Sequence, residues 1–107
     1  MMKNKTQNDI PYKQIAKFCQ KWDIYEFSLF GSILRRDFRE DSDIDVLITF
    51  APESKYGLFD LVHMQEELKK IFGRKVDLIT RRGIETSRNY IRRNAILNTA
   101  KVIHAAR

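Results

Sequence analysis

Two aspartates that flank an isoleucine at the start of an apolar run constrain the fold of this chain most strongly. Asp43, Ile44 and Asp45 lead directly into the residues 46–48, Val-Leu-Ile. Because side chains alternate between the faces of a β-strand, the two carboxylates would share one face and Ile44 the other. Adjacent carboxylates on a buried strand repel each other and resist desolvation. A hard divalent cation such as Mg²⁺, which prefers carboxylate oxygens, would remove both costs.

A glycine–serine step stands ten residues before this pair, at Gly31 and Ser32. The alternating and aromatic residues 24–30 predict a strand that ends at this step, and residues 32–37 predict a short helix capped by Ser32. Glycine permits a tight turn, and the backbone amides of such a turn before a helix can bind a phosphate. The two features together predict a metal-assisted site for a phosphorylated ligand.

The spacing Gly-Ser, ten residues, Asp-x-Asp resembles the nucleotidyltransferase signature of the DNA-polymerase-β-like superfamily. Arg35, Asp37 and the segment 75–79 (Lys-Val-Asp-Leu-Ile) extend this resemblance to the minimal nucleotidyltransferases, which are often paired with a HEPN-type ribonuclease toxin. It covers the chain from about Ile15 to the C-terminus. Leu34 and Arg36 depart from the pattern, since many relatives carry a small residue and a glycine there.

The resemblance implies a role for each matching residue. Asp43 and Asp45 would hold two Mg²⁺ ions and contact the nucleotide, and Asp77 would complete the metal site beside the acceptor hydroxyl, as a candidate to take its proton. Gly31 and Ser32 would bind the terminal phosphates of ATP. The other matching residues have rival explanations: Asp77 could pair with a surface lysine, and Arg35 could be a solvated helix residue. Arg36 and Asp37 are weaker candidates still.

The predicted fold class is α/β (α+β), with a small mixed sheet flanked by helices. Apolar residues at three- and four-residue steps predict helices, and alternating or continuous apolar runs predict strands. We expect Cys19 to be buried on the first helix, His63 to be a solvent-facing or hydrogen-bonded structural residue, and Tyr90, Ile91 and Leu97 to point inward from the last helix. Predicted helices are 12–22, 58–72 and 85–98, and predicted strands are 24–30, 44–50, 75–80 and 102–103.

Length and composition exclude several classes of protein. With 107 residues, of which 43% are hydrophobic, the chain has room for one modest core. We expect a flexible tail over 1–10 and a single domain over 11–107. The sequence has neither an apolar signal-peptide core nor a membrane-length apolar run, which predicts a cytoplasmic location. One cysteine and two distant histidines argue against a structural zinc site.

The formal net charge of +6 is concentrated in the last quarter of the chain. Residues 1–80 are balanced, whereas residues 81–107 carry seven lysines and arginines against Glu85 alone. Such a segment could bind a partner protein, nucleotide phosphates or RNA, or it could simply be a solvated helix face. The sequence alone leaves these alternatives open.

The small size of the chain predicts that another molecule presents the acceptor hydroxyl, because larger relatives carry extra domains to hold the acceptor. The resemblance implies an antitoxin that transfers AMP from ATP to a tyrosine of a HEPN-type toxin and so blocks its ribonuclease activity. Two alternatives remain: a non-catalytic antitoxin that neutralises its partner by occlusion, and a nucleotidyltransferase that acts on a small molecule or an RNA end.

Overall fold

The computed structural model describes residues 10–31 and 43–106. Its sheet has four strands in the order β3-β2-β1-β4. Strand β1 pairs antiparallel with β2 and with β4, whereas β2 and β3 are parallel, so the sheet is mixed as predicted. The elements in chain order are α1 (Tyr12–Trp22), β1 (Ile24–Phe30), β2 (Ile44–Phe50), α2 (Leu58–Phe72), β3 (Val76–Thr80), α3 (Arg81–Glu85), α4 (Tyr90–Thr99) and β4 (Lys101–Ala105).

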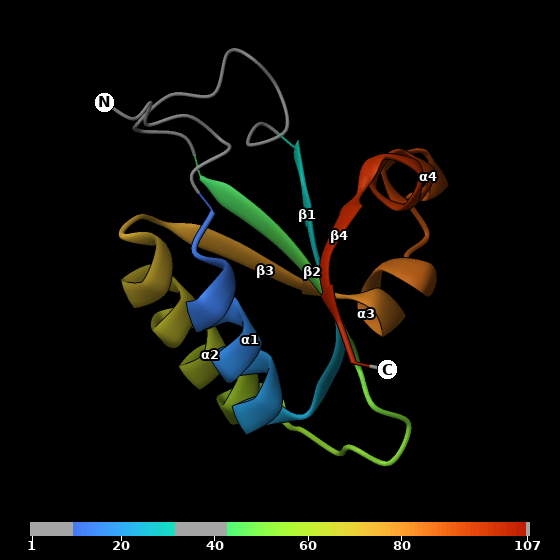
Figure 1. Cartoon of the computed structure of the whole chain (residues 1–107). Coiled ribbons are helices and arrows are strands. Elements are labelled where there is room, and N and C mark those ends of the chain that lie inside the picture. The colour runs from blue at the N-terminus through green and yellow to red at the C-terminus, as the bar shows by residue number, and fades with distance from the viewer. Residues whose placement is uncertain (1–9, 32–42, 107) are drawn as a thin grey trace, which may run out of the picture.

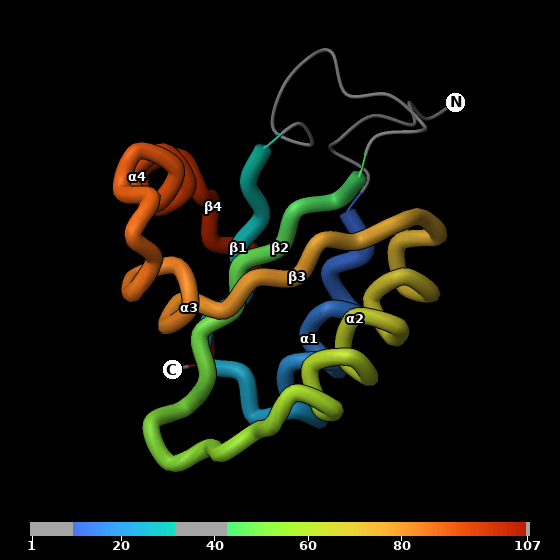
Figure 2. The backbone as a smooth tube through the Cα atoms, turned by 180° about the vertical axis from the view of Figure 1, so that it is seen from behind, coloured from blue at the N-terminus to red at the C-terminus, as the bar shows by residue number. Residues whose placement is uncertain are grey.

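Helices cover both faces of this sheet. Figures 1 and 2 show α1 and α2 on one side and α3 and α4 on the other, in opposite views. Strand β2 is therefore apolar on both faces, as a central strand between two helical layers must be. Val46 is fully buried toward α1 and α2, and Leu47 is 2% exposed toward α3 and α4.

The larger core lies between the sheet and the first two helices. It includes Ile15, Phe18 and Cys19 from α1, Met64 and Leu68 from α2, and alternate residues of the strands. Cys19 is 2% exposed, which confirms its predicted burial, and that burial raises the pKa of its thiol to about 12. The smaller core joins Phe30, Leu47, Ile84 and Ile96.

Local sequence explains where α2 begins and ends. The Gly57 N–H donates to the Asp60 carboxylate over 2.9 Å at the start of the helix. Gly73 ends it with a positive φ of 71°, and its N–H donates to the Lys69 carbonyl over 2.8 Å. This confirms Gly73 as the predicted terminator, because glycine adopts a left-handed conformation without a steric penalty. His63 is exposed on this helix, also as predicted.

The C-terminal part of the chain differs from the prediction. The helix expected over 85–98 begins later, as α4 at Tyr90, and α3, which ends at Glu85, is a separate helix absent from the prediction; the strand expected at 102–103 spans Lys101–Ala105. A polar cap precedes each helix: the Thr80 hydroxyl accepts from Gly83 N–H, and the Asn89 side-chain oxygen accepts from Arg92 N–H. Each cap starts its own helix.

Two of the three residues expected to point inward from that helix are in fact exposed. Tyr90 is 61% exposed and Ile91 is 75% exposed, whereas Leu97 packs against the smaller core. Only the C-terminal half of α4 reaches the sheet, so the apolar side chains of its first turn have nothing to cover. Ile10, placed in the predicted tail, packs against the larger core. No helix among the described residues is both long enough and apolar enough to cross a membrane.

Candidate active site

Asp45 and Asp77 occupy directly paired positions on adjacent parallel strands. In the register of β2 and β3, they lie opposite each other, between the pairs Ile44–Val76 and Val46–Leu78. Paired residues of neighbouring strands, about 4.8 Å apart, point to the same face of a sheet. The fold therefore brings together two of the three carboxylates that the sequence singled out.

Both carboxylates face the side of the sheet on which α3 and α4 pack. The strand neighbours of Asp45 and Asp77 belong to the larger core beneath α1 and α2, and alternation places the aspartates on the other side. Asp45 is half-buried, and Asp77, on an edge strand, is exposed. The pair thus has one side against the protein and one side open to a ligand.

Gly31 lies against the carboxylate of Asp45. It follows Phe30, which pairs with Asp45 across the antiparallel strands. The φ of Gly31 is 79°, and a Cβ added there would clash with Asp45 Oδ2 and lie 3.2 Å from its Cγ. Two independent constraints, backbone conformation and space, therefore require glycine at this position. Sequence reasoning missed the second constraint, because only the strand pairing brings residue 31 to residue 45.

Asp43 stands immediately before β2, at the same end of the sheet. It is exposed, and the next residue is anchored beside the start of β3, where Ile44 N–H donates to the Lys75 carbonyl over 2.9 Å. Because β1 is antiparallel to the other two strands, the end of β1 and the starts of β2 and β3 meet at this edge (Figure 1). Gly31 and the three aspartates therefore lie at the same end of the sheet.

The donor set at this edge consists of carboxylate oxygens, which suit Mg²⁺ rather than a softer metal. Within residues 10–31 and 43–106, no three acidic, histidine or cysteine side chains converge closely enough to hold an ion. Asp43 and Asp45 are two residues apart, about 7 Å along an extended strand. Since like charges at close range repel, an ion would be needed to draw the three carboxylates together.

Two predicted site residues, Ser32 and Arg35, lie outside the described residues, as do the weaker candidates Arg36 and Asp37 and the helix predicted over 32–37. The predicted contacts of Ser32 and Arg35 with phosphates therefore remain predictions.

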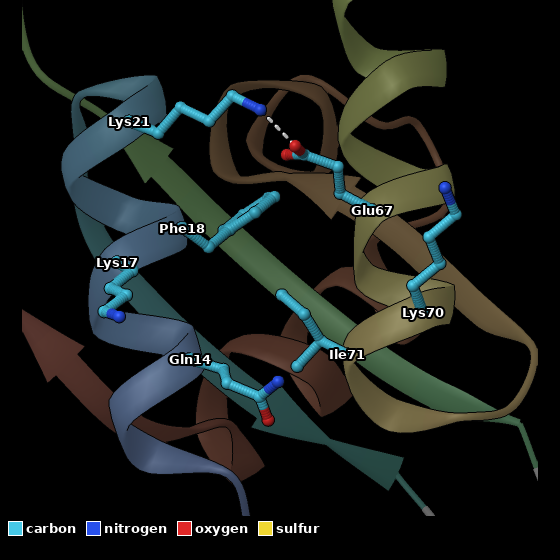
Figure 3. A pocket seen from close by; sticks show the side chains of 7 residues that line it. All are labelled: Gln14, Lys17, Phe18, Lys21, Glu67, Lys70 and Ile71. Atoms are coloured by element: carbon cyan, nitrogen blue, oxygen red, sulfur yellow. Dashed lines mark hydrogen bonds and ion pairs between the residues drawn. The ribbon is translucent and has the colours of Figure 1, made fainter.

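A separate groove lies between α1 and α2, on the opposite side of the sheet from the aspartates. It has a volume of about 370 Å³ and is lined by Gln14, Lys17, Phe18, Lys21, Glu67, Lys70 and Ile71 (Figure 3). An ion pair between Lys21 and Glu67 spans it. Burial alone would raise the pKa of Glu67, but hydrogen bonds from Lys21 and Trp22, with the charges of Lys21 and Lys70, lower it overall. The sheet separates this groove from the carboxylate edge.

Comparison with known proteins identifies the family. Residues 12–102 match the model of the nucleotidyltransferase domain. The chain belongs to this family. The fold class and the resemblance expected from the sequence are thereby confirmed, and the chain is a nucleotidyltransferase.

Two relatives of this chain are named as protein adenylyltransferases. A protein of Methanocaldococcus jannaschii, assigned by inference as a protein adenylyltransferase, is 37% identical over 73 residues, which cover 68% of this chain and 71% of that protein. Protein adenylyltransferase MntA of Thermococcus cleftensis is 30% identical over 67 residues, which cover 63% of this chain and 66% of that protein.

Solved structures share the fold. A toxin–antitoxin crystal structure with AMP-PNP aligns with a TM-score of 0.70 at 16% identity, covering 92% of this chain and 76% of the other. A tri-AMPylated HEPN toxin of Shewanella oneidensis in complex with its MNT antitoxin aligns with a TM-score of 0.61 at 15% identity, covering 89% and 70%. At these identities the likeness establishes the fold.

Proposed function

We propose that this nucleotidyltransferase transfers AMP from ATP to a tyrosine hydroxyl of a HEPN-type ribonuclease toxin and thereby acts as its antitoxin. One observation carries the proposal: Asp45 lies between Gly31 and Asp77 at one end of the sheet. The relatives named as protein adenylyltransferases, and the structural neighbour that contains an AMPylated toxin, support this acceptor class.

In the proposed reaction the acceptor oxygen attacks the α-phosphorus of ATP, the bond to the bridging oxygen breaks, and pyrophosphate leaves. Asp43, Asp45 and Asp77 would hold two Mg²⁺ ions, which would supply charge to lower the pKa of the acceptor hydroxyl and to stabilise the leaving oxygens. Asp77, exposed on the edge strand, is open to the approaching acceptor and would take its proton. Gly31 leaves room for the Asp45 carboxylate, which a side chain at position 31 would displace.

Addition of AMP would disable a ribonuclease by simple electrostatics. A neutral tyrosine hydroxyl would become a bulky phosphodiester with a negative charge, which repels the phosphates of RNA.

The test is intact-mass spectrometry of a HEPN-type toxin incubated with this chain, ATP and Mg²⁺. We expect mass gains of whole AMP units, lost on chelation of the metal and reduced about 100-fold or more by Asp45→Asn, which removes a charge without changing the shape. Glu53→Gln, which neutralises an exposed carboxylate outside the site, is the matched control.

Two other results would overturn the proposal. If the toxin is inhibited with no mass change and Asp45→Asn inhibits it equally well, the chain acts by occlusion. If AMP appears on an RNA end or a small molecule while the toxin stays unmodified, the acceptor class is wrong.

A further inference from the structure

The first turn of α4 presents an apolar and basic surface that no other described part of the chain covers. Tyr90 and Ile91 are 61% and 75% exposed, and Arg88 and Arg92 beside them are exposed as well. We call Arg88, Tyr90, Ile91 and Arg92 the α4 surface. Burial of two large apolar side chains is favourable, so leaving them in water needs an explanation.

The charges of the α4 surface form no ion pairs within the described part of the chain. Arg93 is half-buried and its guanidinium donates to the Glu85 carbonyl over 3.3 Å, and Arg81 pairs with Glu85 over 3.0 Å. Arg88 and Arg92, by contrast, form no ion pair with another described residue. The basic C-terminal quarter thus contains Arg81, which pairs within α3, Arg93, which links α4 to α3, and arginines that face solvent.

The α4 surface is held in a fixed orientation. Asn89 fixes its local backbone: the side-chain oxygen of Asn89 accepts from Arg92 N–H over 3.1 Å, and the Asn89 N–H donates to the Ser87 hydroxyl over 3.2 Å. The Arg93 contact with Glu85 ties α4 to α3. A docking surface gains affinity from such preorganisation, because little conformational entropy is lost on binding.

The position of the α4 surface relative to the aspartates suggests a function for this surface. Helix α4 packs through Ile96 and Leu97 on Phe30 and Leu47, which lie on the face of the sheet that carries Asp45 and Asp77. Helix α4, which carries the α4 surface, therefore lies on the same side of the sheet as the candidate active site, whereas α1 and α2 lie on the other side (Figure 2).

From this arrangement we propose that the α4 surface docks the acceptor protein and brings its hydroxyl to the aspartates. The matching surface would have an apolar pocket for Ile91 and Tyr90, rimmed by Asp or Glu side chains that face Arg88 and Arg92. Tyrosine and arginine are residues that carry binding energy at protein interfaces. This inference rests on the proposed transfer to a protein hydroxyl and adds where that protein binds.

The test measures transfer kinetics with a HEPN-type toxin as the probe. For Tyr90→Ala/Ile91→Ala we expect KM for the toxin to rise about 10-fold or more, with kcat at saturating toxin unchanged. Arg88→Glu/Arg92→Glu should slow association about 10-fold at low salt, and the difference should shrink at high salt. ATP affinity should be unchanged in both variants.

A matched control exists on the opposite face of the sheet. Leu58 and Phe59 at the start of α2 are 76% and 83% exposed, so Leu58→Ala/Phe59→Ala removes similar apolar surface. We expect this variant to keep KM within about 2-fold. Equal losses in both pairs, or a loss in the α2 pair alone, would overturn the proposal.

Two further readouts separate the possible failures. Calorimetric binding of the toxin tests the docking even if no AMP is transferred, so a failure of the proposed chemistry leaves this inference testable. Titration with a single-stranded RNA oligomer tests the other partner class. If the arginine variant loses RNA affinity while its toxin affinity is unchanged, the α4 surface binds RNA and the inference is wrong.

Discussion

Replacing Gly31 by alanine tests the proposed geometry most directly, because the chain contains its own control. Gly31 and Gly73 both adopt left-handed conformations, with φ of 79° and 71°. A Cβ at Gly31 meets the Asp45 carboxylate, whereas a Cβ at Gly73 has nothing within 4 Å. The two substitutions therefore impose the same backbone strain, but only one of them displaces a site residue.

The expected magnitudes follow from these two effects. A non-glycine residue in the left-handed region costs roughly 1–2 kcal/mol, which in a domain of this size lowers Tm by roughly 4–12 °C. Both Gly31→Ala and Gly73→Ala should show this loss. Gly31→Ala must in addition move the Asp45 carboxylate, and a displacement of about 1 Å can cost roughly 100-fold in rate.

Thermal unfolding and ATP calorimetry in the presence of Mg²⁺ would measure the two effects separately. We expect similar Tm values for the two variants, with Mg²⁺-dependent ATP affinity lowered only in Gly31→Ala. If Gly31→Ala binds ATP as well as Gly73→Ala does, the contact between Gly31 and Asp45 is irrelevant to the site. That result would refute the reasoning.

Three further predictions concern stability and reactivity. Asn89→Ala should destabilise the fold by about 1 kcal/mol through loss of the α4 cap, measured by urea unfolding, with Asn98→Ala on the exposed face as control. Glu67→Gln should lower the free energy of unfolding by about 1 kcal/mol at neutral pH. Because the pKa of Glu67 is lowered in the folded state, the stabilisation by its carboxylate is present above the unfolded-state pKa and is lost as the pH falls through the folded-state pKa. The variant and the wild type should therefore have the same stability in acid. Cys19, at 2% exposure and with a pKa raised to about 12, should resist thiol reagents at pH 8 until the protein is unfolded; rapid labelling of the native protein would contradict its burial.

Much of the fold could be predicted from local patterns, because the relevant signals lie within one element. The periodicity of α2 and its terminator Gly73, and the continuous apolar run of β2, give their bounds directly. The separate helix α3 and the start of α4 at Tyr90 depend on the caps at Thr80 and Asn89 rather than on apolar periodicity. Exposure of Ile91 depends on how far the sheet extends beneath α4, and no local pattern contains that information.

The candidate site shows the same distinction. Alternation along one strand predicts that Asp43 and Asp45 share one face, and the resemblance adds Asp77. The exact register of Asp45 with Asp77, and the contact of Asp45 with Gly31, depend on pairing between strands that are distant in sequence. Such pairing is fixed by the assembled core rather than by any single segment.

The aspartates also constrain which sheets this chain can form. A shift of β2 by one residue against β3 would turn Asp45 toward Met64 and Leu68 beneath α1 and α2, and would turn Val46 toward the face that carries α3 and α4. Burying a carboxylate among those side chains is far more costly than losing one pair of backbone hydrogen bonds. The residues proposed for the chemistry would thus exclude misaligned sheets during folding, so that only a correctly assembled chain can bring Asp45 and Asp77 to the same ligand.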